Sequence, residues 1–415
     1  MTRRLRSLLA ATAVIAGLLA AKPTTAAVLR LSADETDLQA AIDRAQDGDV
    51  IELPSGRWQG PLKLDKAVTL RGDGAVIDGG NDGNVIVVDA PGARVEGLTI
   101  RNSGSDVGAP DCCVYVTKRA TGAVIRDNRM QSCVFGIWVH ETAAAQIVGN
   151  HITGRSDLRS ADRGNGIHLF NASHLVVSEN HVEQARDGIY VSATEHSLIE
   201  NNVTVNLRFG IHYMYSYSNT LRGNVASDNA IGLALMESLH LVVEDNEALD
   251  NDRYGILFRD VQYSEIRRNR LERNGHGMFF FSSTDNVVED NRIANNEVGM
   301  KVWAGTRRNG VSGNHIVGNR QQVFYVGAED QFWGEDGSGN RWGDYIGWDQ
   351  DGDGIGDRPH RVESFKARLL HQYPAVALLL RSPALEMLSH LSERLPVMRS
   401  PAIVDRAPLV GEPAS

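Results

Sequence analysis

The sequence predicts an all-β fold, a right-handed parallel β-helix with coils of about 22 residues, and two repeated phrases support it. In the first, an asparagine stands between apolar residues in the pattern apolar-x-x-Asn-x-apolar. In the second, a glycine precedes Ile, Leu or Met. The asparagines are Asn128, Asn150, Asn180, Asn201, Asn224, Asn246, Asn269, Asn291 and Asn314, and the glycines are Gly136, Gly166, Gly188, Gly210, Gly232, Gly255, Gly277 and Gly299.

Each coil is expected to hold two short alternating strands, one around the asparagine phrase and one after the glycine. No helical apolar stripe of adequate length fits in such a repeat, and the frame of a leucine-rich repeat is absent. Asparagine tolerates left-handed backbone angles, and identical side chains can form hydrogen bonds from coil to coil. The asparagine column is therefore predicted to be structural.

The chain divides into five segments. Residues 1–27 read as a cleavable signal peptide, because three arginines precede an apolar run that is shorter than the roughly 20 residues of a membrane span. Residues 28–125 form the N-terminal cap and first coils, with a short helix at 38–45. Residues 126–320 are the regular coils, and the longer step after Asn150 leaves an inserted loop, Gly154 to Asn165, of a kind that often belongs to a binding face. Residues 321–362 form the C-terminal cap, and residues 363–415 an amphipathic helical tail that either covers the last coil or docks on a partner.

Composition and charge exclude some classes of function. The net charge of −10 disfavours nucleic acid as a partner, since phosphate binding needs clustered Lys and Arg. There is no P-loop. An oxidising compartment allows Cys133 to pair with Cys112 or Cys113, and three buried thiols are the alternative.

An aspartate-rich stretch follows the repeats. It reads D-x-D-x-D-G-x-x-D, the first nine positions of a calcium loop, with His360 at the twelfth position, where an EF-hand has Glu, and Glu363 as a later candidate ligand. We expect a structural Ca²⁺ there, held by carboxylate oxygens and one carbonyl. The expected ligands are Asp349, Asp351, Asp353, Asp357 and the carbonyl of Ile355.

Strand alternation after each glycine sends the second and fourth residues outward. The outward pairs are Trp138 and His140, His168 and Phe170, Tyr190 and Ser192, His212 and Met214, Ala234 and Met236, Leu257 and Arg259, Phe279 and Phe281, and Lys301 and Trp303. Imidazole and thioether suit Cu⁺, and a surface of Met and aromatic residues also suits protein docking. Three readings stay open: the C-terminal helices or a loop cover this face, a partner docks on it, or Cu⁺ binds at His168, His212, Met214 and Met236.

The rival class is a secreted carbohydrate-binding protein or a polysaccharide lyase or epimerase, with Trp138, Tyr190, Phe279 and Trp303 as sugar platforms. Such enzymes need paired carboxylates, or a base beside a charge neutraliser. The repeated strands carry no close aspartate pair, and Asp187 and Asp260 appear isolated in the sequence. The sequence therefore favours a protein without catalytic activity.

Three segments resemble the NosD family, the periplasmic β-helix proteins of nitrous oxide reductase maturation. They are RFGIHYMYSYSN (Arg208 to Asn219), GNRWGDYIGWDQDGDGIGD (Gly339 to Asp357) and YPAVALLLRSPAL (Tyr373 to Leu385). The resemblance implies a non-enzymatic periplasmic protein that associates with an ABC transporter, and is peripheral to the membrane through its partners. It implies three partners: the transporter's membrane subunit, a copper chaperone lipoprotein and the apo-nitrous oxide reductase, whose copper–sulfur centre is being built.

Overall fold

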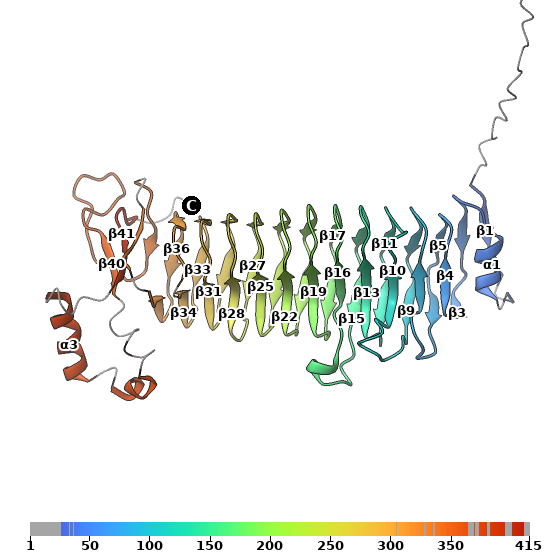
Figure 1. Ribbon diagram of the computed structural model, residues 1–415, viewed down its shortest axis with the longest axis horizontal. Helices are drawn as coiled ribbons and strands as arrows, with labels where there is room; N and C mark the ends of the chain where they lie inside the picture. Colours follow the sequence, from blue (N-terminus) through green and yellow to red (C-terminus); the bar gives the residue numbers. More distant parts are fainter. Residues whose placement is uncertain are drawn as a thin grey trace, which may run out of the picture.

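The computed structural model describes residues 26–410 except residues 33, 36, 304, 328, 335–336, 364–368, 370–372, 380–381 and 395–400. The predicted signal peptide lies outside these residues up to residue 25, as do parts of the predicted helical tail. Three parallel sheets run the length of a rod of stacked coils (Figure 1). The predicted β-helix is confirmed.

Each regular coil contains three short strands, one in each sheet. Sheet A has β1 (Val28–Arg30), β2 (Val50–Glu52), β5 (Thr69–Arg71), β8 (Arg94–Glu96), β11 (Val124–Arg126), β14 (Gln146–Val148), β17 (Val176–Ser178), β20 (Leu198–Glu200), β23 (Thr220–Arg222), β26 (Val242–Glu244), β29 (Glu265–Arg267), β32 (Val287–Glu289) and β35 (Gly310–Ser312). Sheet B has β3 (Gly56–Gln59), β6 (Ala75–Asp78), β9 (Thr99–Arg101), β12 (Arg129–Gln131), β15 (His151–Thr153), β18 (His181–Glu183), β21 (Val203–Val205), β24 (Val225–Ser227), β27 (Glu247–Leu249), β30 (Arg270–Glu272), β33 (Arg292–Ala294), β36 (His315–Val317) and β39 (Arg341–Trp342). Sheet C has β4 (Leu62–Leu64), β7 (Ile86–Val88), β10 (Cys112–Val116), β13 (Phe135–His140), β16 (Ile167–Phe170), β19 (Asp187–Ser192), β22 (Phe209–Met214), β25 (Ile231–Met236), β28 (Tyr254–Arg259), β31 (His276–Phe281), β34 (Val298–Val302) and β37 (Gln321–Tyr325).

The prediction of two strands per coil is wrong, because the asparagine phrase spans a corner rather than one strand. Asn128 lies between β11 and β12, which belong to different sheets. The left-handed backbone angle belongs to the residue before it, Asp127, with φ of 54°. The chain therefore turns just before each asparagine, whose side chain lies inside the corner.

The asparagines form the predicted ladder of hydrogen bonds, with one correction of register. The Nδ2 of Asn180 donates to the Oδ1 of Asn202 at 3.0 Å, and the Nδ2 of Asn202 donates to Asn224 at 2.9 Å. The predicted ladder residue Asn201 is instead the turn residue, with φ of 53° and an exposed side chain, whereas Asn202 is fully buried. Burial of the amide in the corner decides between the two neighbours.

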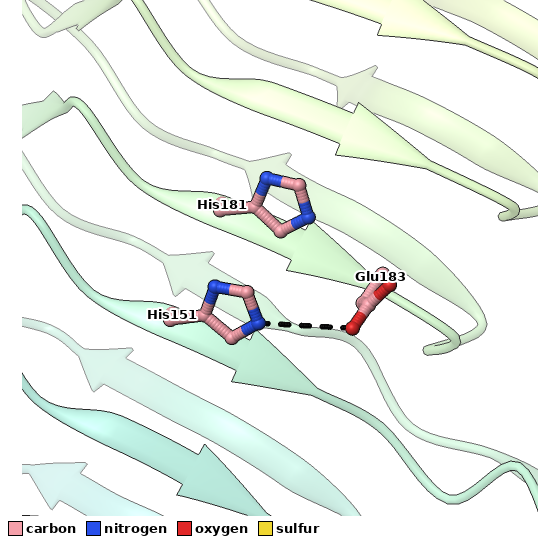
Figure 2. Close-up of side chains that lie close together, drawn as sticks. All are labelled: His151, His181 and Glu183. Carbon is pink, nitrogen blue, oxygen red and sulfur yellow. Dashed lines mark ion pairs between the residues drawn. The ribbon is translucent and has the colours of Figure 1, made fainter.

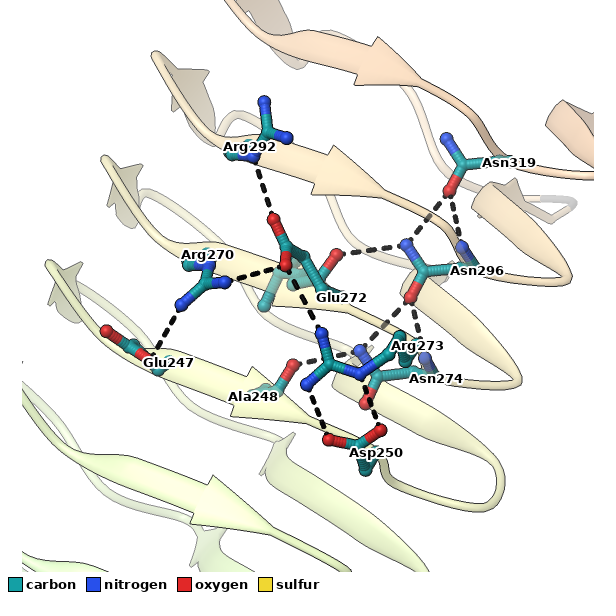
Figure 3. Close-up of polar contacts among 11 residues, drawn as sticks. Glu247, Ala248, Asp250, Arg270, Glu272, Arg273, Asn274, Arg292, Asn296 and Asn319 are labelled. Atoms are coloured by element: carbon teal, nitrogen blue, oxygen red, sulfur yellow. Dashed lines mark hydrogen bonds and ion pairs between the residues drawn. The ribbon is translucent and has the colours of Figure 1, made fainter.

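A second asparagine ladder, which the repeated phrases did not predict, occupies the corner between sheets B and C. Its members are Asn229, Asn251, Asn274, Asn296 and Asn319. Beside it, the nearly buried Glu272 accepts hydrogen bonds from Arg270 and Arg292, both at 2.8 Å (Figure 3). Burial raises the pKa of Glu272, but these two arginines outweigh it and leave the pKa below its ordinary value.

The repeated glycines stand at the corner where the chain enters sheet C. A Cβ at Gly188 would lie 2.4 Å from the carbonyl oxygen of Gly210 on the next coil. No other residue fits so close an approach, which explains the period of the glycine phrase.

Both ends of the rod are capped (Figure 1). At the start, helix α1 (Leu38–Arg44) buries Leu38 and Ile42 against the first coil, and Asp37 accepts a hydrogen bond from the backbone of Ala40 as its N-cap. This confirms the predicted helix. Among the cysteines, Cys113 and Cys133 form a disulfide, and Cys112 is a buried free thiol.

The C-terminal cap is a three-stranded sheet of β38 (Gln331–Trp333), β41 (Ala402–Asp405) and β40 (His360–Glu363). Its buried Asp405 accepts hydrogen bonds from the backbone and Nδ2 of Asn340, the last member of the first ladder. The tail is thus not only helical, since β41 returns to the cap after η2 (Pro374–Leu379) and α3 (Pro383–Arg394). None of the helices in the described part of the chain has the length and apolar character to cross a bilayer.

Candidate metal and docking face on sheet C

The outer face of sheet C carries the predicted outward side chains in two columns. The central column is Tyr115, Trp138, His168, Tyr190, His212, Ala234, Leu257, Phe279, Lys301 and Phe324. The edge column is His140, Phe170, Ser192, Met214, Met236, Arg259 and Phe281. The predicted alternation and register are confirmed for both columns.

Rings in the central column contact one another from coil to coil. Trp138 and His168 stack with centroids 3.8 Å apart, and Tyr190 meets His168 and His212 edge-on at 4.8 and 4.9 Å. Further along, Ile231, Ala234 and Leu257 form a buried apolar cluster, against which Phe279 packs. The column is a continuous apolar and aromatic strip along the rod.

The described helices do not lie over the coils that carry His212 and Met236. Figure 1 shows α3 beyond the C-terminal end of the coils, and the inserted loop with η1 (Ser160–Asp162) projecting from the rod between β15 and β16. Met387, Leu388 and Leu391 of α3 are exposed. In these residues the tail does not cover the face, so the docking and metal readings remain.

His212 is held by a cluster of polar side chains that the sequence did not predict. Its Nδ1 lies 2.9 Å from Oδ2 of Asp187. Arg208 donates to both carboxylate oxygens of Asp187, from Nε to Oδ1 at 2.8 Å and from Nη2 to Oδ2 at 2.6 Å. Burial raises the pKa of Asp187, but the bonds from His212 and Arg208 more than offset this and lower it. Asp187 is therefore a buried carboxylate that fixes the orientation of the imidazole.

The other ring nitrogen of His212, Nε2, is buried and has no hydrogen-bond partner among the described residues. With Nδ1 bound to a carboxylate, Nε2 of the neutral ring carries a lone pair, the arrangement found for histidine ligands of metals. Trp138 Nε1 and His140 Nδ1 on the same face also lack a described partner. Buried polar atoms without a hydrogen-bond partner are rare in native proteins.

The structure brings three of the four predicted copper ligands into one neighbourhood. Met214 follows His212 on the same face of β22, and Met236 is the register partner of Met214 on β25. Adjacent coils stack about 4.8 Å apart. His168 lies two coils from His212, about 10 Å away, with Tyr190 between them. Burial lowers the pKa of His168 to about 3, and its Nδ1 lies 3.3 Å from Nδ2 of Asn165.

Asp187 is thus not isolated, and the prediction that it stands alone is wrong. It occupies the position before the repeat glycine, a third outward column that includes Phe209 and Ile231. Arg208, one coil on, precedes that column. The sequence signal that could have predicted this ion pair is an Asp and an Arg that lie one coil apart, each one or two residues before a repeat glycine.

The calcium-type loop gathers part of the predicted ligand set. One carboxylate oxygen each from Asp349, Asp351 and Asp353 lies within 4.8 Å of the others. The Oδ2 of Asp357 instead accepts a hydrogen bond from the backbone of Gln350 and closes the loop, and Ile355 forms a β-bridge with Leu409. His360 packs against Trp342, and the side chain of Glu363 lies outside the described residues. The three converging carboxylates fit the hard oxygen chemistry of Ca²⁺.

Comparison with known sequences places the chain in a family. A family profile described as "Periplasmic copper-binding protein (NosD)" matches residues 148–347. The chain is 43% identical over 378 residues to the "Probable ABC transporter binding protein NosD" of Pseudomonas aeruginosa, covering 88% of each protein. The chain belongs to the NosD family. The Stutzerimonas stutzeri NosD protein of the same description is 43% identical over 377 residues, covering 87% of this chain and 86% of that one.

Other matches concern the NosD fold or part of the chain. A family of unknown function, DUF1565, matches residues 59–198. The family 28 exopolygalacturonase of Yersinia enterocolitica superposes with a TM-score of 0.54 at 12% identity, covering 70% of this chain and 79% of that one. The catalytic domain of a GH87 α-1,3-glucanase gives a TM-score of 0.51 at 13% identity, with 78% and 70% covered. At these identities the likeness shows the shared β-helix fold alone.

Proposed function

We propose that this NosD-family chain is a non-enzymatic periplasmic accessory protein of an ABC transporter system that matures the copper–sulfur centre of nitrous oxide reductase. It docks partner proteins on the outer face of sheet C and binds Cu⁺ there transiently. The names of its relatives support association with an ABC transporter, and the family description supports the periplasm and copper.

The observation that carries the copper proposal is the buried Nε2 of His212, which has no hydrogen-bond partner among the described residues, on a ring that Asp187 orients and with Met214 and Met236 on the same face. Thioether sulfur is a soft ligand that selects Cu⁺ over Zn²⁺ or Ca²⁺, and imidazole completes such a set. His168 is too far away to share an ion with His212 in this arrangement. We therefore assign Cu⁺ to His212, Met214 and Met236 and give His168 a packing role on Trp138.

A Cu⁺ competition titration against a chromophoric chelator tests this assignment. Wild type is expected to bind one equivalent, and replacing Met214 and Met236 together with leucine is expected to remove it while keeping the apolar volume. The matched control is His140→Ala, on the same face but three coils from His212. Uptake that survives the double methionine variant would refute the copper role.

Partner docking rests on the apolar strip, its orphaned polar atoms, and the exposed apolar residues of the tail. Leu378, Leu379 and Met387 are exposed, as an interface on the transporter's membrane subunit would require. The sheet C face and the inserted loop meet the copper chaperone lipoprotein and apo-nitrous oxide reductase. A tagged chain is expected to retain transporter subunits from solubilised membranes, and Met387→Asp with Leu391→Asp is expected to release them. Retention unchanged by that pair would place the transporter contact elsewhere.

We also propose a structural Ca²⁺ at Asp349, Asp351 and Asp353. Residues beside this loop pair with the C-terminal segment, since Gly356 donates to the carbonyl of Pro408 and Val410 donates to that of Gly354. A bound ion would neutralise three close carboxylates and so hold the end of the chain on the cap.

A polysaccharide lyase or epimerase is the alternative function, and one observation favours it. Asp187, Arg208 and His212 place a potential base beside a charge neutraliser, with Tyr190 in ring contact with His212. Turnover of alginate or polygalacturonate that is lost in His212→Ala would establish it. Inactivity on a broad panel of acidic polysaccharides would leave the accessory role.

A further inference from the structure

A second group of potential metal ligands lies on sheet B, on a different sheet from the copper candidates. His151 of β15 and His181 of β18 are register partners on adjacent coils, and their rings stack with centroids 4.7 Å apart and planes 3° from parallel. Glu183 follows His181 on the same outward face. Figure 2 shows its carboxylate at the edge of the His151 ring.

The distances in this group suit a shared ion better than direct bonds. The Nε2 of His151 lies 3.7 Å from Oε1 of Glu183, too long for a hydrogen bond. One ligand atom from each of the three residues lies within 4.8 Å of the others. Metal bonds of about 2.0–2.2 Å set ligand atoms about 3–4 Å apart. Because the two imidazole planes are 3° from parallel, their lone pairs do not converge as they stand, and one ring must turn out of the stack for both to bind one ion.

Two features favour metal binding by these three side chains: one carboxylate is oriented by a hydrogen bond, and two of the side chains are partly exposed. Thr153, the register partner of Glu183, donates a hydrogen bond to its Oε1 at 3.1 Å and orients the carboxylate. The side chains of His151 and Glu183 are 37% and 29% exposed, which leaves coordination positions open to water or a partner.

We propose that His151, His181 and Glu183 form a binding site for a divalent transition-metal ion of the Zn²⁺ or Cu²⁺ class. Two imidazoles and one carboxylate are the ligands of open zinc sites, and they also suit Cu²⁺. The set lacks the thioethers that favour Cu⁺ and the all-oxygen shell that Ca²⁺ needs. The site is therefore chemically distinct from both metal sites proposed above.

The site lies at the base of the inserted loop. β15 leads directly into residues 154–165, and the backbone of Gly154 donates to the carbonyl of Glu183 at 2.9 Å. Arg163, near the other end of the loop, donates to the carbonyl of Gln184 at 3.1 Å. An ion held by His151 and Glu183 would clamp the strand before the loop to the coil on which the loop rests.

Titration of the purified protein with Zn²⁺, in excess Ca²⁺ to fill the aspartate-rich loop, tests the site. Wild type is expected to bind one Zn²⁺ with a Kd of about 1 µM or tighter. His181→Ala and Glu183→Gln are each expected to weaken binding by at least about 10-fold. Arg129, the register partner of His151 on the preceding coil, adds a repelling charge, so Arg129→Ala is expected to strengthen binding several-fold.

The matched control is the second stacked histidine pair, His174 and His196, whose centroids lie 5.4 Å apart and which belongs to no three-ligand group among the described residues. His174→Ala is expected to leave Zn²⁺ affinity unchanged. Electron paramagnetic resonance with Cu²⁺ is expected to show coupling to two imidazole nitrogens, and only one in His181→Ala. Absence of Zn²⁺ binding in wild type, or binding unchanged in both His181→Ala and Glu183→Gln, overturns the proposal and leaves the Cu⁺ site at His212 untouched.

Discussion

Replacing Asp405 with alanine removes the acceptor at which the first asparagine ladder ends. Its Oδ2 accepts hydrogen bonds from the backbone N–H and Nδ2 of Asn340, at 2.7 and 3.0 Å, and from Nε1 of Trp342 at 2.8 Å. Its Oδ1 accepts one from the backbone of Ala407 at 3.1 Å. An asparagine at the end of a ladder would need a further acceptor, whereas a carboxylate accepts without donating.

The expected loss in free energy of unfolding follows from these contacts. Asp405 is 0% exposed, so alanine leaves its donors buried without acceptors, at about 1–3 kcal/mol each. Allowing for partial relaxation, we expect Asp405→Ala to lower the local free energy of unfolding by about 4–6 kcal/mol. Asp405→Asn keeps one oxygen toward Asn340 and Trp342 and loses only the bond to Ala407, so we expect a loss of about 1–3 kcal/mol.

Amide hydrogen exchange measures this loss where it occurs. Because each coil of a solenoid contacts only its neighbours, the effect is expected in β36, β39 and β41 and not in β20. Exchange at the C-terminal cap should accelerate about 10³- to 10⁴-fold in Asp405→Ala and about 5- to 150-fold in Asp405→Asn. Equal acceleration in the two variants, or none in the alanine variant, would refute the role of the carboxylate as the end of the ladder.

Three further predictions concern charges and metals. Glu272 has a lowered pKa, so its stabilisation is complete above its unfolded pKa of about 4.3 and is lost as the pH falls through the lower folded value. The difference in melting temperature between wild type and Glu272→Gln should therefore shrink as the pH falls below about 4.3. Chelation of Ca²⁺ should lower the melting temperature of the cap by about 2–4 °C in wild type but not in Asp353→Asn, as followed by tryptophan fluorescence, and equal shifts would contradict the calcium site. Asp187→Ala should weaken Cu⁺ binding at least about 10-fold in the chelator competition, because His212 loses the acceptor that orients it, and unchanged affinity would remove Asp187 from the site.

The sequence alone predicted the stacked coils and the outward columns because these depend on period, and it showed the family resemblance through three specific segments. A β-helix repeats the same environment once per coil, so a buried asparagine or a cramped glycine recurs at nearly constant spacing. Strand alternation then assigned Met214 and Met236 to the outer face, and parallel stacking made them register partners. The three segments that resembled NosD proteins led to the family that the relatives confirm.

Only the tertiary structure decided contacts between positions whose sequence spacing carries no period. Asn202 lies 22 residues from both Asn180 and Asn224, so a strict period would have chosen it, but the structure shows why: Asn202 faces the corner and Asn201 turns the chain. Asp187 meets Arg208 and His212 because stacking brings together three different positions of the repeat on two adjacent coils. Asp405 ends a ladder that stops 65 residues before it in the chain, and only the return of β41 to the cap brings it there.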